Sequence, residues 1–256
     1  MTERPDEPID AARRFGGSAR LLGDEGLTRL RAGHVVVVGL GGVGSWAAEA
    51  LARTGVGRLT LIDEDMVAES NVNRQVHALS DTLGAAKVTV MQQRLAQISD
   101  ARVDIVEEFV TPDNAATLLD AGADVIIDAI DRTSVKAAMI VLARTRGQAI
   151  IVCGAAGGRV DPLRLTSNDL ALTEGDALLA SVRKRLRRHH GFSRKLGRRF
   201  GVLTIHSTEQ AAGPESEGAG NFPLACAGYG SIMTVTAAMG LAAAARAIGI
   251  LTAPKA

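Results

Sequence analysis

Residues 35–44 of this chain read VVVVGLGGVG, four β-branched residues that enter a glycine-rich turn. A short, uninterrupted apolar run is typical of a strand buried on both faces of a sheet. Residues 45–53 have the composition of a helix, and Thr54 and Gly55 form a stop signal. A second strand is predicted over Leu59–Ile62, and Asp63 follows it, about 20 positions after the glycines. The stretch therefore predicts a β-α-β unit.

The same alternation continues along the chain. Apolar spacing predicts a helix over Lys87–Ile98, and Thr111-Pro112-Asp113 has the residue types that begin another. Further strands are predicted over three apolar segments, Val103–Val110, Val125–Ile127 and Ala149–Val152. Strands that alternate with helices through short links indicate a parallel sheet. The predicted fold class is α/β, a Rossmann-like, doubly wound and mostly parallel sheet with an additional C-terminal substrate-binding portion.

Composition excludes several classes of protein. Of the 256 residues, 46% are hydrophobic and 22% are charged, which is typical of a globular chain and not of a disordered one. Two cysteines cannot form a disulfide framework or a four-cysteine zinc site. Residues 1–10 are acidic and lack the basic and apolar regions of an export signal. We therefore expect a cytoplasmic protein.

The C-terminal region carries no charge from Gly218 to Ala245. Glycine and proline interrupt its first half, so a continuous helix is expected only from Ser231 onward. Up to Arg246 such a helix would have about 15 residues, fewer than the ~20 that span a bilayer. Its small residues suit close packing between helices. We expect a buried helix and no membrane anchor.

The glycine-rich turn has the chemistry of a phosphate site. Its four glycines, which have no side chain, allow a ligand to approach the backbone closely. These are Gly39, Gly41, Gly42 and Gly44. The helix that follows presents the positive end of its dipole to the same place. Asp63, at a strand end, can accept hydrogen bonds from ribose hydroxyls. This pattern alone is compatible with either NAD or ATP.

The next segment favours a triphosphate. Asn71 and Arg74 follow Asp63 closely, and Lys87 begins the next predicted helix. The guanidinium of Arg74 can bind two phosphate oxygens at once, and the ammonium of Lys87 can neutralise a neighbouring phosphate as a point charge. Asp131, just past a strand end, can hold magnesium against a phosphate. The catalytic set predicted from these types is Arg74, Lys87 and Asp131, with Asp131 also the metal ligand.

These motifs resemble the ubiquitin-activating-like adenylating enzymes, the family of ThiF, MoeB and HesA. The match is closer still to the subgroup that dehydrates threonylcarbamoyladenosine in tRNA. The segments that carry the second resemblance are RFGGSARL at 14–21, WAAEALARTG at 46–55, FVTPDN at 109–114 and STE at 207–209. Together the similar segments cover roughly residues 13 to 250, nearly the whole chain.

The resemblance implies a homodimer that binds Mg-ATP and activates a carboxylate as an acyl-adenylate. In the subgroup, that carboxylate belongs to the threonylcarbamoyl group next to the anticodon, and ring closure with loss of AMP is a net dehydration. By position, Asp63 would hold the ribose, while Asn71, Arg74 and Lys87 would contact the phosphates. Whether a sulfur-transfer protein assists as a partner stays open.

The chain departs from the family pattern in two ways. Relatives that form a thioester or persulfide need a cysteine, and Cys226 is the candidate here. No basic residue lies close to it in the sequence, which favours a small buried residue instead of a reactive thiol. Cys153 is expected in the core. Many relatives supply an arginine from the partner subunit. The matching stretch here holds glycines, so that Arg20 is the nearest candidate and Arg14 the next.

Basic residues are concentrated between Arg183 and Arg199, nine Lys or Arg in 17 positions. The rest of the chain has 20 of the 29 basic residues and all 28 acidic ones, a net charge of −8. Positive charge is therefore concentrated in this segment although the whole chain has a net charge of only +1. This segment is interpreted as a tRNA-backbone contact or, alternatively, as a mobile basic surface loop. The predicted tRNA-binding residues are Arg183, Lys184, Arg185, Arg187 and Arg188, with Phe192 and Phe200 as the candidates for base stacking.

The domain plan follows from these assignments. We expect a flexible N-terminus over 1–12 and an ATP-binding adenylation domain over 13–170. A basic segment and mobile loop over 171–220 and a C-terminal helix over 221–256 would complete it. Three other functions stay open: an activator of a small ubiquitin-like or sulfur-carrier protein, an NAD-dependent oxidoreductase, and a nucleotide-gated RNA-binding module.

Overall fold

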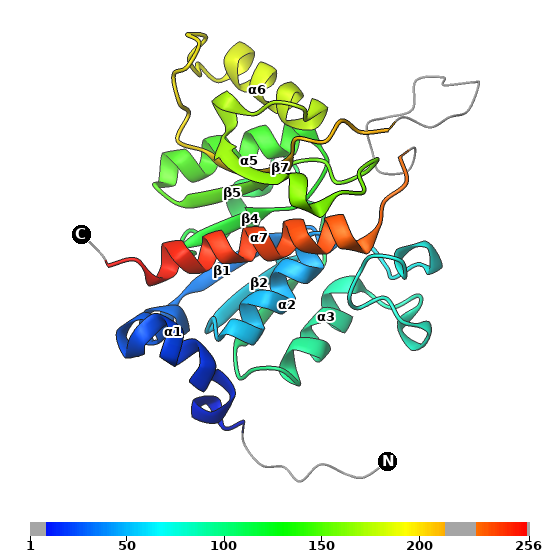
Figure 1. The fold of residues 1–256 in the computed structure, drawn as a ribbon, viewed down its shortest axis with the longest axis vertical. Coiled ribbons are helices and arrows are strands. Elements are labelled where there is room, and N and C mark those ends of the chain that lie inside the picture. The colour runs from blue at the N-terminus through cyan, green and yellow to red at the C-terminus, as the bar shows by residue number, and fades with distance from the viewer. Residues whose placement is uncertain (1–8, 213–228, 255–256) are drawn as a thin grey trace.

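A seven-stranded sheet forms the centre of the fold (Figure 1). The computed structural model describes residues 9–212 and 229–254. The strand order is β3-β2-β1-β4-β5-β7-β6, parallel throughout except for β6, which pairs antiparallel with β7. The strands are β1 (His34–Val38), β2 (Arg58–Ile62), β3 (Arg102–Val106), β4 (Val125–Asp128), β5 (Ala149–Cys153), β6 (Leu165–Asp169) and β7 (Leu203–Ser207). The expected α/β class with a mostly parallel sheet is confirmed.

Within the described part of the chain, seven α-helices cover the two faces of this sheet. They are α1 (Ala11–Ala32), α2 (Gly44–Thr54), α3 (Lys87–Ala96), α4 (Ala115–Leu118), α5 (Thr133–Arg146), α6 (Ala177–His189) and α7 (Met233–Thr252). Short 3-10 turns lie at Glu69–Asn71, Ser80–Thr82, Pro162–Arg164 and Leu170–Leu172. Helices α1, α2, α3 and α7 contribute to the core on one face, and α4, α5 and α6 to the core on the other.

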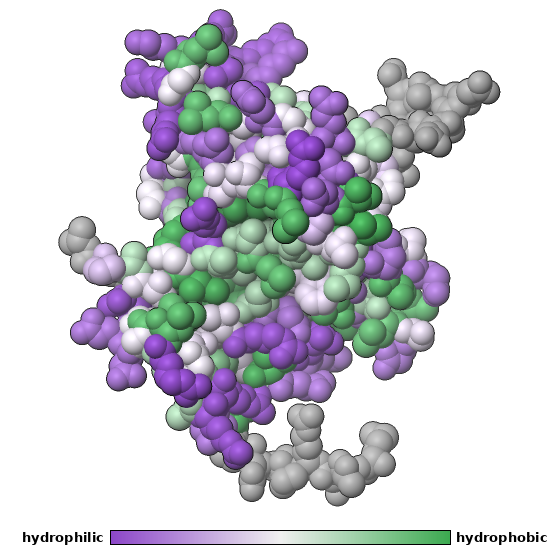
Figure 2. All heavy atoms as spheres, in the orientation of Figure 1, coloured by the Kyte–Doolittle hydropathy of each residue, from purple (hydrophilic) through white to green (hydrophobic). Residues whose placement is uncertain are grey.

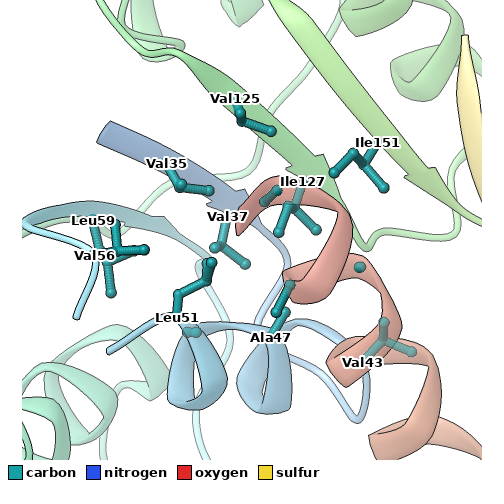
Figure 3. Close-up of a cluster of buried hydrophobic side chains, with 14 of the residues drawn as sticks. Val35, Val37, Val43, Ala47, Leu51, Val56, Leu59, Val125, Ile127 and Ile151 are labelled. Carbon is teal, nitrogen blue, oxygen red and sulfur yellow. The ribbon is translucent and has the colours of Figure 1, made fainter. Parts of the chain in front are cut away.

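Successive residues of each strand alternate between these two cores. Val35 and Val37 of β1 pack with α2 and α7, while Val36 and Val38 pack on the opposite side. Figure 3 shows the first cluster, with Ala47 and Leu51 of α2 beneath the strand residues. Because both faces are covered, every position of β1 is buried, which explains its unbroken valine run.

Helix α7 is longer than the sequence suggested. It begins at Met233, two residues after the expected start at Ser231, and continues past the uncharged stretch through Arg246 to Thr252, 20 residues in all. Its length and apolarity alone would allow it to cross a membrane. It packs on α2, on α1 and on strands β4, β5 and β7, and half of its apolar stretch is buried within the described structure. This is the packing of a core helix.

Other boundaries also differ from the sequence expectations. The strand expected over Val103–Val110 ends at Val106, and the helix expected from Thr111 begins only at Ala115. The hydroxyl of Thr111 accepts from the amide of Asn114, so the threonine caps a turn that precedes the helix. No helix was expected over most of α1, whose glycines and kink at Gly23 weaken the helical pattern.

The domain plan needs two corrections. Helix α1 begins at Ala11, so the expected flexible N-terminus does not extend to residue 12, and residues 1–8 lie outside the described part. Strand β7 pairs with β5 inside the sheet, so the segment 171–220 contains core structure as well as the basic run. Residues 213–220 at the end of that segment, where the mobile loop was expected, lie outside the described residues, as does Cys226. Cys153 is buried in the core as expected, and burial raises the pKa of its thiol to about 12.

The contact between α2 and α7 generates a stability prediction. A Cβ added at Gly240 would lie within van der Waals overlap of the carbonyl oxygen of Val43 and 3.0 Å from the amide nitrogen of Ala47. We expect Gly240→Ala to lower the free energy of unfolding by about 1–3 kcal/mol. The same change at Gly249, where a Cβ would meet nothing within 4 Å, should raise it by up to about 1 kcal/mol. Chemical denaturation gives the free energy of unfolding of both variants. An equal change in the two would contradict the close packing of α2 on α7.

Candidate active site

A cavity of about 310 Å³ lies at the carboxyl ends of the central parallel strands. Backbone hydrogen bonds align these ends: the Gly39 amide donates to Ile62, the Ala129 amide to Val38 and the Asp63 amide to Val106. The loops that follow β1, β2, β4 and β5 are therefore brought to one edge. The predicted residues that line the cavity are Gly39, Gly41, Gly42, Asp63, Asn71, Arg74, Lys87 and Asp131.

The glycines of the loop after β1 have different structural roles. Gly39 has a φ of +88°, which favours glycine. Gly41 and Gly42 line the cavity, and a Cβ at Gly42 would be 3.0 Å from the Arg74 side chain. Gly44 does not line it. A Cβ there would overlap the carbonyl oxygen of Gly39, so Gly44 is needed for the close fold of the loop, which corrects its predicted role in binding.

Asp63 is held by backbone amides. Its carboxylate accepts from the amide of Leu40 at 2.6 Å and from that of Asp65 at 2.9 Å. Burial raises the pKa of Asp63 above its usual value, although Lys87 and the two amides oppose this. The side chain is thus fixed in orientation beside the glycine loop, with the geometry of an acceptor for hydroxyl groups.

Lys87 begins α3 and is buried, with its ammonium 2.7 Å from the carboxylate of Asp65. A buried ammonium requires such a partner. Asp65 is half exposed, and both residues line the cavity. Asp65 was not among the predicted site residues, although its position two residues after Asp63 was the available signal.

The loop between β2 and α3 carries the other two predicted phosphate contacts. Asn71 is buried, and its side-chain oxygen accepts from the amide of Ala68. The guanidinium of Arg74 donates to the carbonyl of Ser70 at 2.8 Å and to the side chain of Asn73 at 2.9 Å. The indole of Trp46 donates to the carbonyl of Arg74 at 2.9 Å, which ties this loop to α2.

Asp131 is exposed on the loop after β4. Its neighbour Arg132 lies with its guanidinium 4.9 Å from the centre of the Phe109 ring, and all three line the cavity. Within residues 9–212 and 229–254, no three His, Cys, Asp or Glu side chains are grouped as a metal site. A single carboxylate is nevertheless compatible with magnesium, which is commonly held by one or two carboxylates together with substrate phosphates.

Residues distant in sequence complete the far wall of the cavity. They are Gly154, Ala155 and Ala156 after β5, Leu178 in α6, and Ser231 and Thr236 near the start of α7. Small and apolar side chains of this kind have no recognisable motif. None of them was predicted as a site residue. Gly154, Ala155 and Ala156 reach the cavity because they follow β5, whereas Leu178 and Thr236 reach it only because α6 and α7 pack against the sheet.

The basic segment divides into internal and exposed residues. Arg183 donates to the carbonyls of Leu170 and Thr173 and to the Thr173 hydroxyl, and burial lowers its pKa. Arg187 donates to the carbonyl of Ser193 and lies over the ring of Phe200. These two arginines hold the segment in place, which corrects their predicted use as tRNA contacts.

The rest of the segment is largely at the surface. Lys184, Arg185 and Arg188 are exposed on α6, and further exposed basic side chains follow at Arg194, Lys195, Arg198 and Arg199. Phe192 and Phe200 are buried and pack edge to face at 4.9 Å, so they are not available for base stacking. In Figure 2 the end of the molecule that carries α6 is strongly hydrophilic.

The two candidate arginines of α1 do not reach the cavity of their own chain. Arg14 donates to the carbonyls of Gln97 and Ile98 at the end of α3. Arg20 is exposed, and neither residue lines the cavity.

Comparisons with known proteins agree with this geometry. Residues 16–256 match the model of the ThiF family. The tRNA threonylcarbamoyladenosine dehydratase of Escherichia coli K12 is 44% identical over 246 residues, covering 92% of each chain, and that of Haemophilus influenzae is 41% identical with the same coverage. The crystal structure of the Escherichia coli enzyme, TcdA, in complex with ATP superposes with a TM-score of 0.86 at 43% identity, over 95% of this chain and 96% of that one. The family model matches nearly the whole length, and the cavity contains the family's motif residues. The chain therefore belongs to the ThiF family.

Proposed function

We propose that this chain is an ATP-dependent tRNA threonylcarbamoyladenosine dehydratase. The observation that carries the proposal is similarity over 92% of both chains to enzymes of that name, combined with a single cavity that gathers the predicted nucleotide residues. The Escherichia coli relative was solved with ATP and with AMP, which are a substrate and a final product of a reaction that passes through an acyl-adenylate. An enzyme that forms an acyl-adenylate releases pyrophosphate first and AMP second.

The chemistry requires activation because a carboxylate is a poor electrophile. In the first step a carboxylate oxygen of the threonylcarbamoyl group attacks the α-phosphorus of ATP, and pyrophosphate leaves. In the second step a nucleophilic atom of the same substrate attacks the acyl carbon and loses its proton. AMP departs with the former carboxylate oxygen. The substrate thereby loses one water in total, and closure within the substrate requires no enzyme thioester.

The cavity residues have complementary roles in this reaction. Asp63, fixed by two amides, accepts hydrogen bonds from the ribose hydroxyls. Asn71, Arg74 and Lys87 contact the phosphates, where charge accumulates as pyrophosphate departs. The ammonium of Lys87 is already held in the cavity wall by Asp65, so it is oriented before ATP arrives. Preorganised charge of this kind stabilises a transition state without the cost of reorientation.

Magnesium belongs to this proposal as a cofactor. When bound, the ion neutralises phosphate charge, and Asp131 is the residue of the cavity that would hold it. Asp131 is exposed and lines the same cavity as Arg74 and Lys87. Phosphate oxygens and water would complete the shell of the ion.

The exposed basic surface is the proposed site for the tRNA backbone. Leu178 lines the cavity, and the exposed residues Lys184, Arg185 and Arg188 follow it on the same helix. At 1.5 Å per residue, they lie about 9 to 15 Å along the helix axis from Leu178. A modified base placed in the cavity would therefore have its flanking phosphates within reach of these cations. Phosphate contacts position a nucleic acid without identifying its bases.

A homodimer in the cytoplasm is the proposed assembly and location. Met233, Leu241 and Ile250 of α7 are exposed apolar side chains, and Figure 2 shows an apolar band across the face that carries this helix. A contiguous apolar surface of this kind is typical of an interface. Arg20 is exposed on α1 and would have to come from the partner copy to reach a phosphate. The involvement of a sulfur-transfer protein stays open.

Adenylation can be tested through ATP–pyrophosphate exchange in the presence of tRNA that carries threonylcarbamoyladenosine. Arg74→Ala, Lys87→Ala and Asp131→Ala should each lower the exchange rate by on the order of 10²–10³, because each removes a charge aimed at the phosphates. Arg53→Ala, at an exposed residue of α2, is the matched control and should keep the rate. Chelation of magnesium should abolish exchange in every protein. Undiminished exchange in Lys87→Ala and Asp131→Ala would refute these roles.

Binding of tRNA can be tested by its salt dependence. Replacement of Lys184, Arg185 and Arg188 by alanine should reduce the slope of log affinity against log salt by about 2 to 3, if each residue neutralises one phosphate. ATP binding should be unchanged in this variant, since none of the three residues lines the cavity. The control replaces Arg13, Arg53 and Arg102, which are exposed outside the segment, and should keep the slope. If both triple variants changed the slope equally, the tRNA would lie elsewhere.

A further inference from the structure

The most completely buried ion pair of the described structure lies directly behind the cavity. Lys136, in the first turn of α5, and Asp128, the last residue of β4, both have fully buried side chains. The ammonium donates to the Asp128 carboxylate at 2.9 Å and to the Cys153 carbonyl at 2.8 Å. It also lies 3.4 Å from the carbonyl oxygen of Asp128. None of the motifs discussed above accounts for Lys136.

The acceptors of Lys136 belong to the ends of two neighbouring strands. Asp128 ends β4 and Cys153 ends β5, and these strands pair in parallel up to this point. Beyond it the chain separates into two loops, 129–132 and 154–156, and residues of both line the cavity. One ammonium therefore connects the two strand ends at the position where the backbone ladder between them stops.

The first of these loops is also tied to the pair and to the glycine turn. The amide of Ile130 donates to the Asp128 carboxylate at 3.3 Å. A Cβ at Gly39 would lie 2.9 Å from the Ile130 side chain and 3.1 Å from the carbonyl oxygen of Ala129. A change in the position of Asp128 would therefore be transmitted to Asp131 on one side and to the glycine turn on the other.

Stability alone does not account for such a pair. A buried ion pair loses the hydration of two charges, and its replacement by apolar groups of the same shape is often neutral or stabilising. We infer that Lys136 is a positioning residue, which sets the spacing of the loops that carry Asp131 and Ala155 on two sides of the cavity. This inference rests on the proposed function for its consequence in catalysis, while its consequence for nucleotide binding can be measured separately.

The test removes the ammonium without leaving an unpaired charge. Asp128→Asn combined with Lys136→Met keeps the shapes of both side chains and removes the link to Cys153. The midpoint of thermal unfolding should stay close to that of the wild type, while ATP affinity measured by calorimetry falls about tenfold or more. In pyrophosphate exchange, kcat should fall in addition to any rise in KM. Met139→Leu, at a buried residue of α5 outside the cavity lining, is the control and should keep the wild-type affinity.

A second measurement uses the wild-type protein and does not depend on the fold of a variant. The nitrogen-15 resonance of the Lys136 ammonium should show slow proton exchange with water and should shift when ATP is added. Wild-type ATP affinity in the folded double variant would overturn the inference. So would a rapidly exchanging ammonium whose resonance is unaffected by ATP. If the wild type bound ATP but did not modify tRNA, only the proposed function would fail, because the affinity comparison would remain valid.

Discussion

The backbone ladder on the two sides of β1 is the constraint on which the site depends. Val38 is in register with Ile62 of β2 and with Asp128 of β4, so three parallel strands end at the same level. The residues that follow them are Gly39, Asp63 and Ala129, and they are neighbours for that reason alone. A glycine turn, a ribose acceptor and the loop to Asp131 are brought together by main-chain hydrogen bonds before any side chain contributes. Figure 1 shows these strands surrounded by helices on both faces.

This constraint explains why much of the fold could be predicted from the sequence. Strands buried on both faces consist of unbroken β-branched runs, as at Val35–Val38. The helices between them can be recognised by apolar residues three or four positions apart. Parallel order then requires the residues at the strand ends to share one edge. Asp63 and Asp131 could be predicted because each lies just past a predicted strand, and Lys87 because it begins the next predicted helix and matches the family's motif.

The parts that could not be predicted depend on contacts between distant segments. Thr236 and Leu178 reach the cavity only because α7 and α6 pack where they do, and neither has a local signal. The uncharged stretch from Ser231 to Ala245 has only about 15 residues, but α7 continues to Thr252 because the exposed Arg246 is compatible with a helix. Basic residues presented the same difficulty. Arg183 and Arg188 belong to one run in the sequence, yet one binds carbonyls inside the protein and the other is exposed.

If the cavity activates the carboxylate of threonylcarbamoyladenosine, this nucleoside loses water. Mass spectrometry of nucleosides tests this activity most directly, with tRNA incubated with the protein, ATP and magnesium and then digested under mild conditions. Threonylcarbamoyladenosine should be converted to a product lighter by one water, and only when ATP is present. An unchanged nucleoside after incubation with folded protein that binds ATP would show that the cavity does not catalyse this dehydration.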